Sequence, residues 1–370
     1  MATIEPYETS TGARRYMVRY RTPQRTQTKK RGFTTMRDAK EFAATVEVDK
    51  MTGTYVKPSA SKVVFGELAE SWFAGKVNLS ASTRARYRSA LDVHILPVFG
   101  SVALADVTPE RVRRWIASAA ASSSAATVRK NHTVLHQVLA QAVTDGRASV
   151  NVAADIELPT IDETEKRYLT AGQIQGLADA AGEHGPLVLL LGFTGLRFGE
   201  AAALRVADID LTHGRVRVQR SVTAVGKRMV YSAPKSHQAR TVPLPRFLVD
   251  VLIEHLRCSI RTALAFPDSR GGPMRLSNVR RRWWAQAVAD SGAPAGLTPH
   301  ELGHSAASMA ISAGASIKVV QRMLGHKSAT LTLDRYGHLY HDELQNVADR
   351  LDSMYAECAQ NVPTRLRVVR

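Results

Sequence analysis

The sequence predicts a multidomain protein, with a small β-sheet plus one helix, an all-α domain, and a mixed α/β domain that is mainly helical. At 370 residues the chain is too long for one small core. Near the N-terminus, apolar residues recur at every second position, as in a strand. Farther along the chain they recur with the spacing of a helix. Two polar, proline-containing stretches, 57–62 and 157–163, interrupt the pattern. We therefore expect domains at 1–57, 63–157 and 165–355, followed by a basic tail at 356–370.

The net charge indicates what kind of molecule the protein binds. Lys and Arg number 50 against 33 Asp and Glu, a net charge of +17. Such an excess attracts polyanions, of which nucleic acid is the commonest. Cys258 and Cys358 offer neither a disulfide framework nor a zinc-ribbon spacing. No apolar run approaches the ~18 residues of a membrane span, and no hydrophobic signal segment opens the chain. We expect a cytoplasmic protein without membrane association.

Residues 1–57 predict a small sheet covered by one helix. Apolar and polar residues alternate through 16–21, as in a strand. A turn at 22–24 leads to a second possible strand that reaches Phe33, and a helical apolar face follows in 39–46. The uncovered face of such a sheet would present arginines to phosphates or base edges, although a solvated charged hairpin is the alternative. The candidate contacts are Arg14, Arg15, Arg19, Arg21, Arg25, Lys29, Lys30 and Arg31.

The segment from 63 to about 156 has a helical repeat throughout. The expected elements are helices at 65–73 and 83–93, a break at 96–100, a helix start at Thr108-Pro109, a turn at 121–126 and a long helix at about 127–144. Arg84, Arg86 and Arg88 lie along the second helix and are further candidates for nucleic-acid contacts.

Beyond residue 163 the pattern is mixed. Helices are expected around 187–191, a strand pair around 215–222 and 229–243, and further helices after it. An apolar helical stripe at 344–354 follows. This last helix either covers the core of its own chain or packs on a neighbouring protomer.

Short motifs follow one another in the second half of the chain. They are Thr194–Glu200 (TGLRFGE), Pro234-Lys235-Ser236, His300–His304 (HELGH), Leu324-Gly325-His326 and Tyr336. Their order resembles the active site of the tyrosine recombinases, the phage-integrase family. The surrounding stretches at 190–210, 232–245 and 318–338 resemble the family's boxes more closely than any single motif does.

The residue types suit DNA strand cleavage without a metal. That reaction needs a nucleophile for phosphorus, cationic donors for the phosphate oxygens, and a proton donor for the leaving oxygen. Arg fits the second role because its forked donors match phosphate oxygens. A compact ammonium on a flexible stem fits the third.

The resemblance implies a role for each matched residue. Tyr336 attacks the scissile phosphate and forms a 3′-phosphotyrosyl link, and Lys235 protonates the freed 5′ oxygen. Arg197, His300 and His326 stabilise the phosphate, and Glu200 supports the site. The reaction passes through a Holliday junction in a homotetramer, and it uses no ATP, metal or other cofactor.

The resemblance also implies an arm-site DNA-binding domain at 1–57, a helical, SAM-like core-site-binding domain at 63–157 and a catalytic domain at 165–355. The implied partners are double-stranded attachment sites of core and arm type, a host DNA-bending protein and an excisionase-type directionality factor. The implied setting is the nucleoid of a bacterial host.

One position departs from the family. Its pattern in the third motif is His-x-x-Arg, and Gly303 stands at the Arg position. A charge-assisted contact worth ~1.5–3 kcal/mol is therefore missing. By analogy with a deleted oxyanion donor, the rate would fall ~10²–10³-fold. We expect a protein that binds and pairs its sites but cleaves slowly or not at all.

Two alternatives remain at this point. A DNA-binding protein without strand-transfer activity would carry the same charge and domains. The motif His300–His304 also formally matches the His-Glu-x-x-His signature of zinc metallopeptidases, with Glu301 as the base. No separate motif designates a third zinc ligand.

Overall fold

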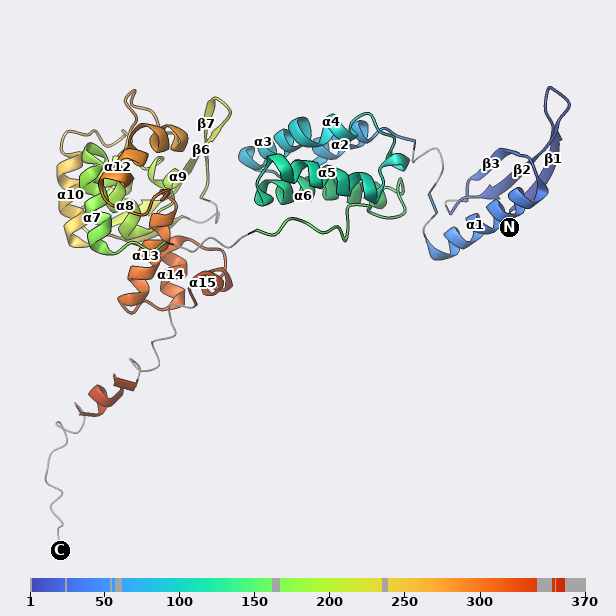
Figure 1. Ribbon diagram of the computed structural model, residues 1–370. Coiled ribbons are helices and arrows are strands. Elements are labelled where there is room, and N and C mark those ends of the chain that lie inside the picture. The colour runs from blue at the N-terminus through green and yellow to red at the C-terminus, as the bar shows by residue number, and fades with distance from the viewer. Residues whose placement is uncertain are drawn as a thin grey trace, which may run out of the picture. The chain divides into compact units, whose positions relative to one another are not determined.

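The computed structural model describes residues 2–23, 25–53, 55–56, 62–161, 167–234, 239–337, 348–349 and 351–356 (Figure 1). The chain divides into two compact units, Met1–Glu163 and Thr164–Arg370. The first unit contains two apolar clusters, one under the N-terminal sheet and one among the helices that follow. The predicted linker at 57–62 lies almost wholly outside the described residues.

The N-terminal sheet has three antiparallel strands in the order β1-β2-β3. The elements are β1 (Thr3–Glu8), β2 (Arg14–Arg21), β3 (Gln27–Phe33) and α1 (Met36–Thr52). The predicted strands β2 and β3 and the covering helix are confirmed, whereas β1 was not predicted. This edge strand contains Pro6, which has no amide hydrogen and is tolerated only at a sheet edge. Val18, Tyr20, Ala39 and Val46 form the buried core between the sheet and α1.

Residues 62–161 form a helical body. Its helices are α2 (Phe65–Gly75), α3 (Ala81–Ser89), α4 (Leu96–Phe99), α5 (Pro109–Ser122) and α6 (Ala125–Thr144). The predicted start at Thr108-Pro109 is confirmed, because the Thr108 hydroxyl accepts a hydrogen bond from the amide of Arg111. The predicted turn at 121–126 shrinks to Ser123 and Ser124, and Ser124 caps α6.

The predicted break at 96–100 occurs only at its end, because the chain stays helical from Ala81 to Phe99 and the helix ends at Gly100. A π-helical turn at Ala90–Ile95 precedes Pro97, and the amide of Leu96 bonds to the carbonyl of Leu91, five residues back. Proline lacks an amide hydrogen, and its ring would meet the carbonyl four residues earlier in a regular α-helix. The wider turn relieves this conflict and lets the helix continue through the proline.

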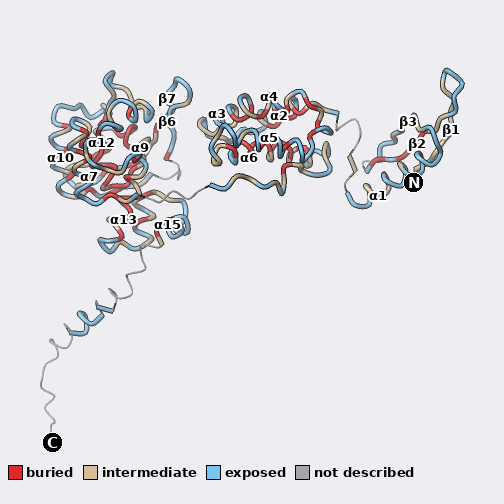
Figure 2. The backbone as a smooth tube through the Cα atoms, in the orientation of Figure 1, coloured by how far each residue is buried: buried red, intermediate tan, exposed pale blue. Residues whose placement is uncertain are grey.

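The second unit is mainly helical, as expected. Its helices are α7 (Ala171–Ala180), α8 (Gly185–Thr194), α9 (Phe198–Ala201), α10 (Arg246–Leu256), α11 (Leu276–Val279), α12 (Ala285–Asp290), α13 (Glu301–Ser312), α14 (Ile317–Leu324) and α15 (Ala329–Tyr336). Leu187–Leu191 are all buried, because α8 is packed by α7, α10 and α13. Figure 2 shows this buried interior in red within an exposed surface.

The strands of this unit correct the predicted pair at 215–222 and 229–243. They are β4 (Ile209–Asp210), β5 (Arg215–Val218), β6 (Ser221–Val225), β7 (Arg228–Ser232) and β8 (Arg240–Pro243). One sheet has the order β4-β5-β8, and β6 and β7 form a separate hairpin. The first predicted strand is interrupted at Gln219 and Arg220, whose side chains both bond to Asp208 instead of continuing the alternation.

The C-terminal stripe at 344–354 lies partly outside the described residues, which include 348–349 and 351–354. In the part that is described, Leu351 and Met354 are exposed. All of the predicted tail except residue 356 also lies outside. Among the described helices, none is both long and apolar enough to cross a membrane.

Candidate active site

Arg197 enters the site from the turn between α8 and α9. Helix α8 ends at Gly195, whose φ of +65° is left-handed and favours glycine. A Cβ there would also lie 2.5 Å from Cδ2 of Leu324, so any other residue at 195 would require the Leu324 side chain of α14 to shift. Arg197 then caps α9, and its Nη2 donates to the carbonyl of Gly325 at 3.2 Å. The turn thus joins the first motif to the segment that carries His326.

Glu200 is buried, with 1% of its side chain exposed, and it binds two arginines. Its Oε1 accepts from Arg197 Nη1 at 2.9 Å, and its two carboxylate oxygens accept from Arg240 at 3.0 and 2.7 Å. Burial alone would raise the pKa of Glu200, but the hydrogen bonds and charges of Arg240 and Arg197 outweigh it and hold that pKa below its ordinary value. The carboxylate therefore stays ionised and fixes both guanidinium groups. The sequence prediction of a supporting role included Glu200 but missed Arg240.

Glu200→Gln is expected to lower the free energy of unfolding by ~3 kcal/mol at pH 7, because two partly buried guanidinium groups lose their shared negative charge. The folded-state pKa of Glu200 is below the ordinary 4.5, so this stabilisation is present above 4.5 and is lost as the pH falls through the lowered value. Urea unfolding at several pH values measures the difference. The matched control is Glu254→Gln, whose exposed pair with Arg257 should contribute less than ~1 kcal/mol. Equal effects of both substitutions would contradict the inference that Glu200 holds the guanidinium groups of Arg197 and Arg240.

His300 and Gly303 lie at the start of α13. The helix begins at Glu301, with His300 in the capping position. The Glu301 carboxylate accepts hydrogen bonds from the amide and the hydroxyl of Thr298, at 2.7 and 2.9 Å. A Cβ added to Gly303 would approach no atom closer than the carbonyl oxygen of Gly195 at 4.0 Å, beyond its chain neighbours and its own helix backbone. The space beside residue 303 is therefore open.

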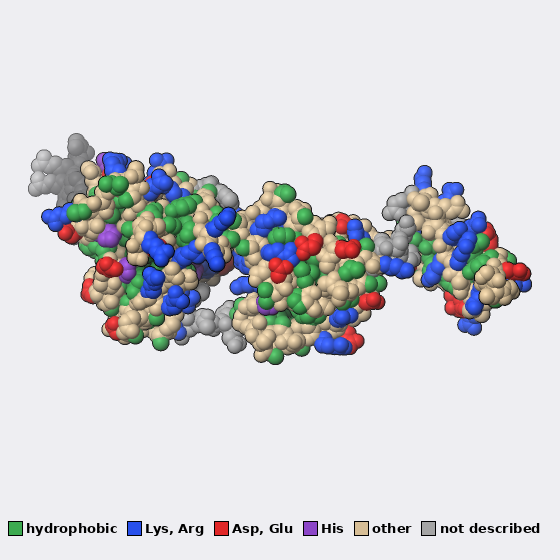
Figure 3. Space-filling model, turned by 90° about the horizontal axis from the view of Figure 1, so that it is seen from above, with side chains coloured by type: hydrophobic (Ala, Val, Ile, Leu, Met, Phe, Trp, Pro, Cys, Tyr) green, Lys and Arg blue, Asp and Glu red, His purple; other side chains and the backbone are tan. Residues whose placement is uncertain are grey.

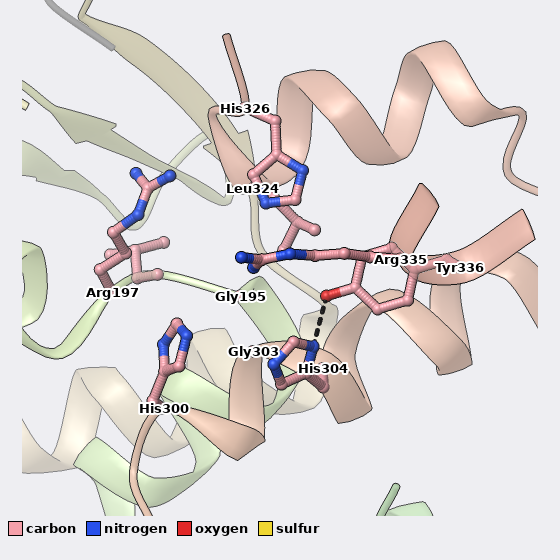
Figure 4. Close-up of a pocket in the computed structure, with 10 residues that line it drawn as sticks. Gly195, Arg197, His300, Gly303, His304, Leu324, His326, Arg335 and Tyr336 are labelled. Atoms are coloured by element: carbon pink, nitrogen blue, oxygen red, sulfur yellow. Dashed lines mark hydrogen bonds between the residues drawn. The ribbon is translucent and has the colours of Figure 1, made fainter. Parts of the chain in front are cut away.

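Tyr336 is the last residue of α15 and is 2% exposed. Its hydroxyl lies 2.7 Å from Nδ1 of His304 (Figure 4). Burial raises the pKa of Tyr336 to about 12, although the charge of Arg335 acts in the opposite direction. The phenol is therefore neutral at pH 7 and has a hydrogen-bond partner suited to accept its proton.

His326 follows the left-handed cap of α14. Its Nδ1 lies 2.9 Å from the hydroxyl of Thr332. Burial, together with the positive charges of Arg197, Arg335 and Arg240 and the ring of His304, lowers the pKa of His326 to about 4. The ring is therefore neutral at pH 7, and one of its two nitrogens carries a proton. Its plane is nearly parallel to that of Tyr336, with centroids 6.5 Å apart.

These side chains converge on one pocket, as Figure 4 shows. The lining residues are Gly195, Leu196, Arg197, His300, Gly303, His304, Leu324, His326, Arg335 and Tyr336. The structure thus brings together the predicted Arg197, His300, His326 and Tyr336. His304 and Arg335 also line this pocket, and neither was predicted to act in the recombinase reaction. His304 lies one helical turn from His300, a spacing that places two residues on one helical face, whereas the adjacent positions of Arg335 and Tyr336 do not.

Lys235 lies outside the described residues, so the structure does not place it. The neighbouring strands β7 and β8 end and begin at Ser232 and Arg240.

The geometry gives the zinc interpretation no support. Its proposed base, Glu301, is hydrogen-bonded to Thr298, and the second histidine, His304, is bonded to Tyr336. Over the described ranges, no group of three or more His, Cys, Asp or Glu side chains could hold a metal ion.

The basic residues of the N-terminal sheet divide between its two faces. Strand alternation places Arg15, Arg19 and Arg31 on the face away from α1, where Arg19 pairs with Glu5 at 3.2 Å. Lys30 lies on the other face, with its ammonium 4.2 Å from the ring centroid of Phe42. An open basic face therefore exists, but Lys30 is not part of it. The remaining candidates Arg14, Arg21, Arg25 and Lys29 are exposed.

The arginines of α3 have different surroundings. Arg88 is bonded to both Glu70 and Asp92, and Arg84 donates to the carbonyl of Lys76 at 3.1 Å. Arg86 is exposed. Exposed Lys and Arg side chains are also spread over the face of the second unit seen in Figure 3, with few acidic groups between them.

Comparison with known proteins follows the same division of the chain. Residues 167–343 match the phage integrase family, and residues 65–158 match the phage integrase central domain. The prophage phiRv2 integrase of Mycobacterium tuberculosis is 33% identical over 283 residues, which cover 74% of each chain. The integrase of Mycobacterium phage D29 is 29% identical over 286 residues, 75% of each chain.

Solved structures share the fold. The Tn1549 transposon integrase in complex with a circular intermediate DNA has a TM-score of 0.67 at 20% identity, covering 78% of this chain and 99% of that one. A lambda integrase tetramer bound to a Holliday junction has a TM-score of 0.60 at 20% identity, covering 88% and 96%.

The fold and the pocket define a DNA strand-transferring enzyme of the tyrosine recombinase class. The chain belongs to the phage integrase family and is a site-specific recombinase.

Proposed function

We propose that this recombinase integrates and excises phage DNA, with Tyr336 as nucleophile and Arg197, His300 and His326 as the groups that bind the scissile phosphate. The observation that carries this assignment is the convergence of these four side chains, from segments between 197 and 336, on one pocket of one chain. Because nucleophile and phosphate ligands come from the same chain, cleavage occurs within one protomer's own site.

The chemistry follows from the hydrogen bonds. The phenolic oxygen of Tyr336 forms a bond to phosphorus, the bond to the 5′ oxygen breaks, and a 3′-phosphotyrosyl link results. Nδ1 of His304 accepts the phenolic proton, since it lies 2.7 Å from that oxygen. Lys235, by family resemblance, protonates the leaving 5′ oxygen. Neutral His326 donates a ring N–H to a phosphate oxygen, and Arg197 contributes charge.

Gly303 weakens this site. Arg197 alone remains of the two arginines in the family pattern, and a missing charge-assisted contact costs ~1.5–3 kcal/mol. The chain therefore binds and pairs its DNA sites but cleaves them more slowly than a variant with arginine at 303 would.

The wider assembly follows the same proposal. The sheet domain at 1–57 binds arm-type DNA, the helical domain at 63–157 binds core-type DNA, and the domain at 165–355 performs catalysis. Four protomers hold a Holliday junction in the bacterial nucleoid, assisted by a host DNA-bending protein and an excisionase-type factor. The open basic face around Arg15, Arg19 and Arg31 supports the first of these roles.

A nicked suicide duplex tests the function. The duplex is chosen by footprinting on candidate attachment sites with the full chain and with residues 1–57 removed. A nick beside the cleaved bond releases a short 5′-hydroxyl fragment, so the covalent intermediate accumulates. We expect a detergent-resistant adduct in which a DNA 3′ phosphate is linked to tryptic peptide 336–350. A footprint without an adduct, even after prolonged incubation, would favour a DNA-binding protein that transfers no strands.

A further inference from the structure

The open space beside Gly303 faces a second arginine that is not in the family's pattern. Arg335 is the penultimate residue of α15 and lines the same pocket as Gly303 and Arg197. In Figure 4 its guanidinium extends away from the ring of Tyr336 toward Arg197, beneath His326 and above the first turn of α13. It approaches the pocket from the side opposite to Arg197.

The arrangement suits a phosphate ligand. A phosphate bound at this pocket would have both Arg197 and Arg335 among the residues that line its site, together with Tyr336. A planar guanidinium keeps its charge at any physiological pH and presents paired donors to phosphate oxygens. The side chain of Arg335 is half-buried, so its field is only partly screened by water. That field already opposes the rise in the pKa of Tyr336 and lowers the pKa of His326.

We propose that Arg335 supplies, from the nucleophile's own helix, the second guanidinium for the scissile phosphate that Gly303 does not supply. This inference rests on the proposed function of the pocket. It predicts that a site with glycine at 303 keeps a measurable cleavage rate, and it makes the cation move together with Tyr336 because the two residues are adjacent in α15.

A double-mutant cycle tests the proposal. Arg335→Gln and Arg335→Lys are compared in the native chain and in the Gly303→Arg background, by the rate of covalent adduct formation on the suicide duplex. In the native chain, Arg335→Gln should lower the rate ~10²-fold, the range of one charge-assisted contact, and Arg335→Lys should restore part of it. In the Gly303→Arg background the same substitution should cost less than ~3-fold, because arginine 303 then provides the contact.

The matched control is Arg322→Gln, which removes the same charge from an exposed position on α14. Its rate should stay within ~2-fold of the native rate, as for a surface substitution. Gel-shift binding of the duplex and thermal unfolding verify that each variant folds. A loss at Arg335 that is equal in both backgrounds, or no loss in the native chain, overturns the proposal. Adduct formation by the native chain persists in these outcomes, so the proposed function would stand without it.

A neutral substrate provides a readout that a purely structural role would not change. When a methylphosphonate replaces the scissile phosphate, the ground-state negative charge is removed and a neutralising cation contributes less. We expect the deficit of Arg335→Gln to shrink from ~10²-fold to less than ~10-fold on this substrate. An unchanged deficit means that Arg335 only shapes the pocket, which contradicts the proposal. Failure of every variant to form an adduct on either substrate rejects both the inference and the proposed function.

Discussion

Tyr336→Phe is expected to abolish the covalent DNA adduct while leaving DNA binding intact. Phenylalanine removes only the attacking oxygen, and removal of a covalent nucleophile costs at least ~10⁴-fold in rate. The ring stays buried, and the lost hydrogen bond to His304 costs only about 1 kcal/mol of stability. Detergent gels of the suicide-duplex reaction measure the adduct, and gel shifts measure binding.

Two other tyrosines near the end of the chain provide the controls for the assignment of the nucleophile. Peptide 336–350 also contains Tyr340, and Tyr355 follows it on an exposed helical segment. Tyr340→Phe and Tyr355→Phe should both form the adduct at close to the native rate. If Tyr336→Phe still forms the adduct and one of these variants does not, the nucleophile has been assigned to the wrong residue.

Gly303→Arg should raise the rate of adduct formation by ~10²-fold. The backbone position accepts a side chain, because no atom outside its own helix and chain neighbours lies within 4.0 Å of the new Cβ. From this first turn of α13 a guanidinium reaches the same pocket as Arg197 and His300. We expect the low end of the ~10²–10³ range for one transition-state donor, because Arg335 already provides part of this stabilisation. Single-turnover trapping on the suicide duplex measures the change.

Gly176→Arg is the matched control for the increase in adduct formation that we expect from Gly303→Arg. Gly176 is also a helical glycine, in α7, with no atom near the position of its Cβ, and the substitution adds the same charge. It should change DNA binding slightly and leave the cleavage rate nearly unchanged. Equal rates for the native chain and Gly303→Arg would mean that glycine at 303 does not limit cleavage.

The motifs allowed the main residues of the pocket to be predicted because each one carries its own local geometry. Arg197 and Glu200 are three residues apart in one capping turn, and His300 caps the helix that contains Gly303. Local spacing alone therefore determines how each pair is arranged. Family resemblance supplied the remaining information, namely that these separate turns meet.

Contacts between distant segments were not predictable in the same way. The bond between His304 and Tyr336 joins residues 32 positions apart, and Arg240 reaches Glu200 from a strand 40 positions away. Arg240 has no local pattern that distinguishes it from a surface residue, and the spacing of His304 from His300 does not indicate a contact with Tyr336. The π-helical turn before Pro97 was missed for another reason, since a proline ordinarily ends a helix unless the packing of its neighbours favours continuation.

The burial of the Tyr336 hydroxyl limits the reactivity of the nucleophile before cleavage. Its phenol stays protonated and is shielded from water, with a pKa of about 12, so Tyr336 is a poor nucleophile in this conformation. Cleavage therefore requires that the phenol lose its proton within the assembled site, where His304 lies 2.7 Å from the hydroxyl and the charge of Arg335 favours the phenolate.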